Sequence, residues 1–351
     1  MAALIALAAV GAALFAAPCH AAENTGDAFP HGLSYMTAFG PKNYSVVSLL
    51  YGVIVISLVV MTIIGVLVLA GALIRGRRGD AATLRSVPIE RGGFGLLFIY
   101  IGIGLSFLVL TATVVWNYSV LADIVAPSSR PVATVHIVGH QWWWEVDYEG
   151  ADPSRNFVTA NEIHVPVGEP VKVTLSTADV IHSFWVPALT GKMDTIPGQH
   201  NTTWMQADKP GIYRGQCTEY CGQQHAHMAF VVMAQAPNEF KTWWDHQLQG
   251  PKELRAESGL KSAEAGQMVF MKNCAVCHTV RGTMAHGKVG PDLSHLMERH
   301  TIAAGTLPNS IGALSGWISN PQHIKPGNFM PTLDLSAEDL NNLRSFLETL
   351  Q

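Results

Sequence analysis

The chain begins with long, uninterrupted apolar runs and changes further on to alternating apolar and polar positions. Residues 43–74 and residues 92–122 carry no charged side chain. Each run is longer than the ~20 residues that an α-helix needs to cross a hydrocarbon core of ~30 Å. The pattern predicts a two-helix transmembrane hairpin over residues 43–122, with helices at about 46–74 and 94–118. Buried helices of a soluble protein are the less favoured alternative.

The segment between the two apolar runs is rich in arginine. It contains Arg75, Arg77, Arg78, Arg85 and Arg91. An excess of arginine in a short loop is typical of the cytoplasmic side of a membrane. We therefore expect the N-terminus and everything after the second run to lie on the outer side.

The first 22 residues contain a short apolar run that ends in small residues, as a secretory signal peptide does. A short membrane anchor and a lipoprotein signal that uses Cys19 are the alternatives. Pro18 disfavours both, because it breaks the run and replaces the small residue that precedes a lipidated cysteine. No lysine or arginine precedes the apolar core, which departs from the usual pattern.

Beyond the hairpin, the period of the pattern changes. Residues 131–236 place β-branched and aromatic residues at every second position and are punctuated by Pro and Gly, which predicts a compact all-β sandwich. Residues 237–262 predict a short helix, with Asn238 as its N-cap, and then a polar linker. Residues 263–351 begin and end with helical patterns, which predict a small all-α domain.

Composition supports a membrane-anchored protein and excludes one class of partner. Only 14% of the residues are charged, against about 25% in soluble proteins. The formal net charge of -4 offers no basic surface for nucleic acid, so we expect no nucleic-acid partner.

The loop "QCTEYCGQQHAHM" gathers soft metal ligands. Cys217, Cys221, His225 and Met228 lie within twelve residues, and "DVIHSFWVP" offers His182 from a strand end. A disulfide between the cysteines is the alternative in an oxidising compartment. Thiolate, imidazole and thioether together suit copper, and a mononuclear blue-copper site uses only one cysteine. Because two thiolates can bridge two ions, a binuclear copper centre fits best.

Four motifs, "HQWWWEV", "DVIHSFWVP", "GKMDTIPGQ" and "GQCTEYCGQQHAHM", resemble subunit II of the haem–copper respiratory oxidases over residues 40–240. The resemblance implies a cupredoxin-type sandwich that holds the binuclear centre CuA. The implied ligands are His182, Cys217, the backbone carbonyl of Glu219, Cys221, His225 and Met228.

The same resemblance implies two further roles. The Glu219 side chain would help to bind a magnesium or manganese ion shared with subunit I. Trp142 matches the family's exposed tryptophan through which electrons enter the copper centre, whereas Trp143 and Trp144 are interpreted as strand aromatics. If a haem is fused to the chain, electrons can also arrive by another path.

The motif "CAVCH" is the C-x-x-C-H pattern of covalent haem attachment. Cys274 and Cys277 would form the thioethers and His278 the first axial ligand. The second axial ligand is expected from Met330 in "KPGNFMPTLDL", with Met297 or His323 as alternatives. This context resembles the class I cytochromes c. Once Cys19 leaves with the signal peptide, no cysteine remains for a disulfide.

The combined pattern predicts an electron relay with a haem c and a copper centre in one chain. It resembles the oxidase subunit that passes electrons to subunit I, where oxygen is reduced to water, and we expect no residue of this chain to be catalytic toward oxygen itself. The expected partners are subunit I, subunit III, and a c-type cytochrome or other donor, in a bacterial inner membrane. A nitric oxide reductase subunit and a membrane-anchored electron carrier or copper-delivery protein are the alternatives. A quinol oxidase subunit is disfavoured because that branch lacks the copper ligands.

Overall fold

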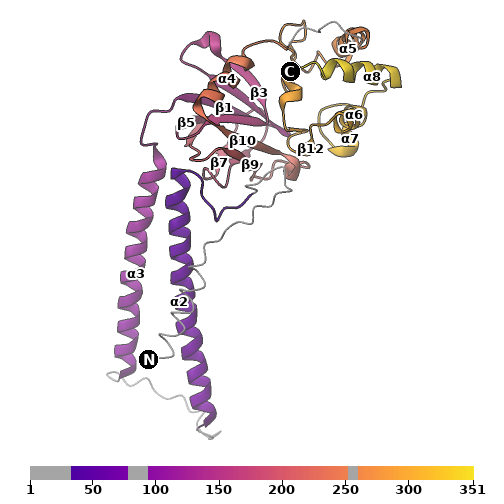
Figure 1. Cartoon of the computed structure of the whole chain (residues 1–351). Coiled ribbons are helices and arrows are strands. Elements are labelled where there is room, and N and C mark those ends of the chain that lie inside the picture. Colours follow the sequence, from indigo (N-terminus) through magenta and orange to yellow (C-terminus); the bar gives the residue numbers. More distant parts are fainter. Residues whose placement is uncertain (1–32, 78–93, 252–259) are drawn as a thin grey trace.

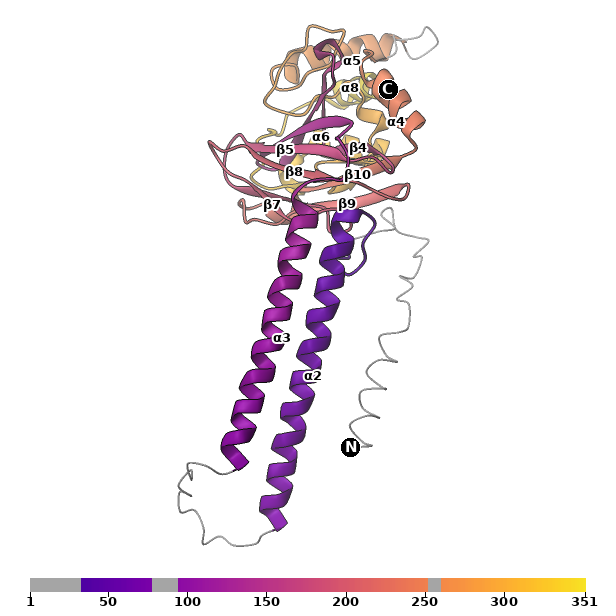
Figure 2. The ribbon, with the colours of Figure 1, turned by 90° about the vertical axis from the view of Figure 1, so that its left-hand side faces the viewer.

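The computed structural model describes residues 33–77, 94–251 and 260–351. The predicted signal peptide, residues 1–22, and most of the arginine-rich loop lie outside the described residues. Two long helices stand side by side and carry a globular part at one end (Figure 1, Figure 2).

The two helices are α2 (Pro41–Arg77) and α3 (Phe94–Val125), both longer than predicted. They extend at their outer ends because they contact the sandwich there. Trp204 Nε1 donates a hydrogen bond to the carbonyl oxygen of Ile124 at 3.0 Å. Both helices are long and apolar enough to span a membrane, and their side chains are mostly exposed, as expected of surfaces that face lipid. Gly52 leaves room for the Trp116 ring between them.

Residues 133–235 form a sandwich of two five-stranded sheets, as predicted. One sheet has the order β3-β2-β1-β5-β8 and the other β4-β10-β9-β6-β7. The strands are β1 (Ala133–His140), β2 (Trp143–Glu149), β3 (Phe157–Ala160), β4 (Glu162–Pro166), β5 (Val171–Thr177), β6 (His182–Trp185), β7 (Met193–Thr195), β8 (Asn201–Met205), β9 (Gly211–Cys217) and β10 (Ala229–Gln235).

The alternation in the sequence decides which side chains enter the core of the sandwich. Along β1, buried and partly exposed residues alternate without interruption, because successive side chains of a strand point to opposite faces. Trp144 of β2 is fully buried and packs edge-on against Phe184 and Phe230 of the other sheet, with ring centroids 6.0 and 5.5 Å apart. These aromatic contacts join the two layers of the sandwich.

Helix α4 (Pro237–Gln247) covers one end of the sandwich. The predicted N-cap at Asn238 is wrong: Ala236 is the N-cap and Pro237 the first helical residue. Proline suits that position because its φ is already helical and it needs no hydrogen-bond acceptor. Trp243 and Trp244 pack on Tyr148, both with centroid distances of 5.2 Å, and so hold the helix on the sandwich.

The C-terminal domain is helical, as predicted, but its first helix begins inside the predicted linker. It contains α5 (Leu260–Asn273), α6 (Ile311–Ser319), α7 (Pro321–Ile324) and α8 (Ala337–Leu347), with a short hairpin of β11 (Thr301–Ile302) and β12 (Leu307–Pro308). Gly266 of α5 touches the backbone of Asn342 in α8, so these helices cross at close range.

The C-terminal domain packs directly on the sandwich. Glu162 of β4 accepts hydrogen bonds from the backbone amides of His300 at 2.5 Å and Thr301 at 3.3 Å. Ala229 N of β10 donates to the carbonyl oxygen of Ala304 at 3.0 Å. We call the contact between residues 133–235 and residues 260–351 the domain interface.

Candidate metal centres

We call residues 217–228 the copper-ligand loop, because they contain four of the predicted side-chain ligands of copper. This loop connects β9 to β10 and contains a short 3-10 helix, η2 (His225–His227). Cys217 ends β9, and its amide donates to the carbonyl oxygen of Met228 at 3.1 Å. This bond closes the base of the loop, so residues far apart along it face the same space. β6 lies beside β9 and delivers His182 to that space.

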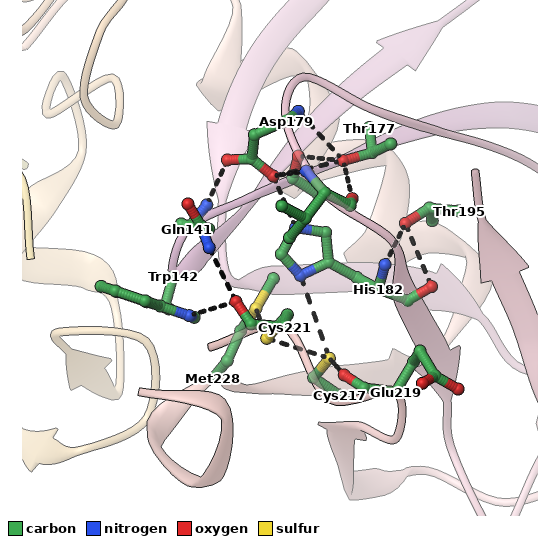
Figure 3. Close-up of polar contacts among 12 residues, drawn as sticks. Gln141, Trp142, Thr177, Asp179, His182, Thr195, Cys217, Glu219, Cys221 and Met228 are labelled. Atoms are coloured by element: carbon green, nitrogen blue, oxygen red, sulfur yellow. Dashed lines mark hydrogen bonds and ion pairs between the residues drawn. The ribbon is translucent and has the colours of Figure 1, made fainter. Parts of the chain in front are cut away.

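The five predicted side-chain ligands converge in the structure. Figure 3 shows four of them, His182, Cys217, Cys221 and Met228. The two cysteine Sγ atoms are 3.8 Å apart, and His182 Nδ1 lies 4.0 Å from Cys217 Sγ. Cys221 Sγ lies 3.6 Å from His225 Nδ1 and 3.9 Å from Met228 Sδ. This spacing lets several donors share one small metal cluster, since metal–sulfur and metal–nitrogen bonds are about 2.0–2.3 Å long.

Glu219 contributes its backbone rather than its side chain to this space. Its carbonyl oxygen lies 3.3 Å from Cys217 Sγ. Its exposed carboxylate points away from the sulfur atoms, toward the surface (Figure 3). The side chain is therefore accessible to a separate ion or to a partner.

The two thiols are free in the structure, and the hydrogen bond between them shifts their pKa values in opposite directions. A hydrogen bond from Cys221 lowers the pKa of Cys217 to about 3, despite the opposing effect of burial. The same hydrogen bond raises the pKa of Cys221, and burial adds to that rise. The pair thus favours one thiolate without metal, and a cationic metal that displaces the second proton would bind both sulfurs.

Asp179 orients His182. Its Oδ1 lies 2.8 Å from His182 Nε2, which turns Nδ1 toward Cys217. Burial lowers the pKa of His182, but the hydrogen bonds to Asp179 and Cys217 outweigh it and raise the pKa overall. Gly139 is required beside this ring, because a Cβ there would lie 2.7 Å from His182 Cδ2.

The C-terminal domain contains a largely apolar cavity that fits a haem. Cys274, Cys277 and His278 line it, together with Met330 and apolar side chains of α5, α6 and α8. His278 Nδ1 donates a hydrogen bond to the carbonyl oxygen of Pro291 at 2.8 Å. The proton therefore lies on Nδ1, and the lone pair of Nε2 is left free to bind a metal. Burial lowers the pKa of His278, so the neutral ligand form is favoured.

Among the methionines considered for the second axial position, only Met330 lines this cavity. Met297 packs against the core of the domain without lining the cavity, and His323 does not line it either. The Met330 loop is held by two hydrogen bonds, from Met330 N to Asn328 Oδ1 and from Gln322 Nε2 to the Met330 carbonyl oxygen, both at 2.8 Å.

Trp142 is buried, contrary to the expectation of an exposed tryptophan. Only 8% of it is accessible, because the C-terminal domain covers it and its side chain lines the haem-sized cavity. Its Nε1 donates to the carbonyl oxygen of Cys221 at 3.0 Å, and Gln141 Nε2 donates to the same oxygen at 2.7 Å. Trp142 therefore lies between the cavity and the copper-ligand loop.

Comparisons with known proteins agree with a copper centre in the sandwich and a haem in the C-terminal domain. Residues 151–235 match the family model of the cytochrome c oxidase subunit II periplasmic domain, and residues 263–351 match that of cytochrome c. Cytochrome c oxidase subunit 2 of Alkalihalophilus pseudofirmus is 35% identical over 91% of this chain and 92% of its own length. The chain belongs to the cytochrome c oxidase subunit 2 family.

Further relatives in the family cover less of the chain. Cytochrome c oxidase subunit 2 of Bacillus sp. (strain PS3) is 30% identical over 79% of this chain and 80% of its own length. The solved periplasmic domain of subunit II of Bradyrhizobium japonicum cytochrome oxidase is 33% identical, with a TM-score of 0.31, over 34% of this chain and 96% of its own. A cytochrome c oxidase subunit II with a cytochrome c domain implies electron transfer in an oxidase, and copper and haem c as cofactors.

Sequence reasoning missed several residues at these centres. Asp179 stands three positions before His182 in a motif already singled out, so the partner of the histidine could have been sought there. Gln141 and Gln224 gave no signal, because amide side chains are common on surfaces. Lys325 gave none either, since a lone lysine predicts solvent exposure, yet it is buried at the domain interface.

Proposed function

We propose that this chain is the electron-input subunit of a terminal oxidase in a bacterial inner membrane. In this role it accepts electrons from a c-type cytochrome or another donor and delivers them to the haem and copper of subunit I, where oxygen is reduced to water. The two apolar helices would anchor it and dock it beside subunits I and III, with the sandwich and the cytochrome domain on the outer side. Bound haem and paired copper supply the one-electron chemistry.

The copper ligands in this proposal are His182, Cys217, the backbone carbonyl of Glu219, Cys221, His225 and Met228. Convergence of two thiols, two imidazoles and a thioether on one space supports this set. The Glu219 carboxylate is proposed to bind magnesium or manganese together with subunit I, and its exposure supports that role.

The haem ligands in this proposal are Cys274 and Cys277 for the thioethers, and His278 and Met330 for the iron. His/Met ligation raises the haem potential. The walls of the cavity are mostly apolar. A bound haem would therefore meet little water, and few dipoles around it would have to reorient when the iron gains or loses charge.

The contact made by Trp142 carries the proposal of an internal relay. One indole lines the cavity and also hydrogen-bonds, through Nε1, to the carbonyl oxygen of a copper-ligand residue, Cys221. This arrangement supports Trp142 as the electron-entry residue. A separate donor would otherwise approach this surface, but the chain's own cytochrome domain covers it.

The experiment is to purify the oxidase complex and to follow haem oxidation after rapid reduction. Trp142→Phe should slow transfer from haem to copper by roughly tenfold or more, since it removes the hydrogen bond and contracts the ring; tenfold is a barrier change of about 1.4 kcal/mol. Trp243→Phe, on α4 and outside the lining of the cavity, is the matched control and should react like the wild type. A complex that consumes nitric oxide but not oxygen, or that lacks copper, would contradict the proposed function.

A further inference from the structure

Lys325 is buried at the domain interface, in the segment that leads from α7 to Met330. Only 3% of the residue is exposed. Its Nζ donates hydrogen bonds to three backbone carbonyl oxygens: Trp142 at 2.8 Å, His227 at 2.9 Å and Ala303 at 3.2 Å. Two acceptors belong to the sandwich and one to the cytochrome domain, so a single ammonium group joins three segments that are distant in the sequence.

The three acceptors match the charged form of the side chain. An ammonium group has three N–H donors and no acceptor, and each donor finds a carbonyl oxygen. A neutral amine would turn its lone pair toward one of those oxygens. Burial lowers the pKa of Lys325 to about 7. The carbonyl groups thus replace much of the hydration that burial removes.

The residues around Lys325 hold the same two loops together. Gln224 is 4% exposed, and its Nε2 donates to the carbonyl oxygen of Pro326 at 2.7 Å. Gly327 has a φ of +83°, which favours glycine, and its Cβ position lies 2.6 Å from Gln223 Oε1, so the two loops approach closely here. The loop that carries Met330 is therefore docked on the loop that carries the copper ligands.

The charge of Lys325 is placed where it acts on electron transfer. Within the described residues, its hydrogen-bond partners are all carbonyl oxygens and none is a carboxylate. It donates to the backbone of Trp142 and to that of His227, which lies between the proposed copper ligands His225 and Met228 in the sequence. A cation in a poorly polarisable interior favours the neighbouring centre that has gained an electron, since Coulomb energies grow as the effective dielectric constant falls.

We propose that Lys325 is a positioning residue that docks the cytochrome domain on the copper-ligand loop and raises the reduction potential of the copper centre. The electrostatic part rests on the proposed function, whereas the docking part does not. In the step that it assists, one electron leaves the reduced haem iron and reduces the copper pair by one electron. No bond forms or breaks in this step.

The first test measures docking of the cytochrome domain on the copper-ligand loop. It uses the full-length chain in detergent, without metals. Lys325→Met keeps the length of the side chain and removes its charge. Amide hydrogen exchange should become faster in peptides that cover residues 225–231 and 300–306, which meet through the hydrogen bond from Ala229 N to Ala304 O. Lys272→Met, an exposed lysine of the same domain, is the control and should exchange like the wild type. Unchanged exchange in Lys325→Met would overturn the docking role.

The second test measures how the charge of Lys325 affects the midpoint potential of copper in the purified oxidase. Lys325→Met should shift the copper midpoint potential downward and slow electron transfer from haem to copper. Lys325→Arg keeps the charge and changes only the shape of the donor group, so it should accelerate exchange and leave the potential unshifted. Faster exchange with an unshifted potential in Lys325→Met would overturn the electrostatic role.

Two results separate these roles from other failures. If Lys325→Met does not accumulate, Lys325→Gln takes its place: faster exchange than in the wild type in residues 225–231 and 300–306 supports the docking role, and wild-type exchange contradicts it. A wild-type complex without copper or oxygen consumption refutes the proposed function and leaves the exchange result standing.

Discussion

Asp179 holds the ring of His182 so that one nitrogen is occupied and the other faces the cysteine pair. The carboxylate oxygen lies 2.8 Å from Nε2, and Nδ1 lies 4.0 Å from Cys217 Sγ. Asp179 also accepts a hydrogen bond from the backbone amide of Gln141 at 2.7 Å, which ties it to the segment that precedes Trp142. The orientation of His182, a proposed copper ligand, thus depends on a residue outside the proposed ligand set.

Replacing this carboxylate should weaken metal binding and leave the fold intact. Asp179→Asn should lower copper affinity by about 10–100-fold, the usual effect of losing the group that orients a ligating histidine. Copper content after dialysis against a graded chelator measures the effect. Asp194→Asn, on the exposed strand β7, is the control. Equal copper retention in both variants would contradict the orienting role of Asp179.

Spectroscopy should separate the two centres. Met330→Leu should lower the haem midpoint potential, because loss of the thioether removes His/Met ligation, and should leave the near-infrared absorbance of mixed-valence copper unchanged. Met228→Leu should alter only the copper signal. Met297→Leu is the control for the haem, since Met297 does not line the cavity. Cross-effects between the centres, or a haem change in Met297→Leu, would show that the ligand assignment is wrong.

Much of the fold could be predicted because its signals are local. Charge-free runs predict α2 and α3, period-two alternation predicts the sandwich, and both metal motifs lie within short segments. The arrangement of the two domains could not be predicted, because it depends on contacts between distant residues. Trp142 was expected to be exposed by analogy with an unfused subunit, and its burial follows from the domain that covers it. Lys325 is buried for the same reason.

The domain interface should respond to pH through His300. Its Nδ1 lies 3.3 Å from Glu162 Oε2, and this hydrogen bond raises the pKa of His300 above its ordinary value despite partial burial. The stabilisation is therefore fully present below the unfolded-state pKa of about 6.5 and is lost as pH rises through the higher folded-state pKa.

The expected loss of stability is small, because 46% of the His300 side chain is exposed to solvent. The midpoint of urea unfolding of the full-length chain in detergent, followed by tryptophan fluorescence, should fall between pH 6 and pH 8.5. His300→Gln should reduce this fall, and an identical pH dependence in both proteins would rule out a contribution from the His300–Glu162 pair.

Two glycines of the cytochrome domain should respond in opposite directions to the same substitution. A Cβ on Gly266 would lie 1.9 Å from the carbonyl oxygen of Asn342, so α5 and α8 would have to separate. Gly316 of α6 is exposed and has no atom of another residue within 4 Å of its Cβ position. Gly266→Ala should therefore destabilise the domain by about 1–3 kcal/mol or more, the cost of overpacking.

Gly316→Ala should instead stabilise the domain by about 0.5–1 kcal/mol, because alanine loses less backbone entropy in a helix. The urea midpoint of haem absorbance in the full-length chain measures both changes. If Gly266→Ala unfolded at the wild-type midpoint, the close crossing of α5 and α8 would be wrong. The haem-sized cavity would then need a different shape, because Phe270 of α5 and Leu343 of α8 both line it.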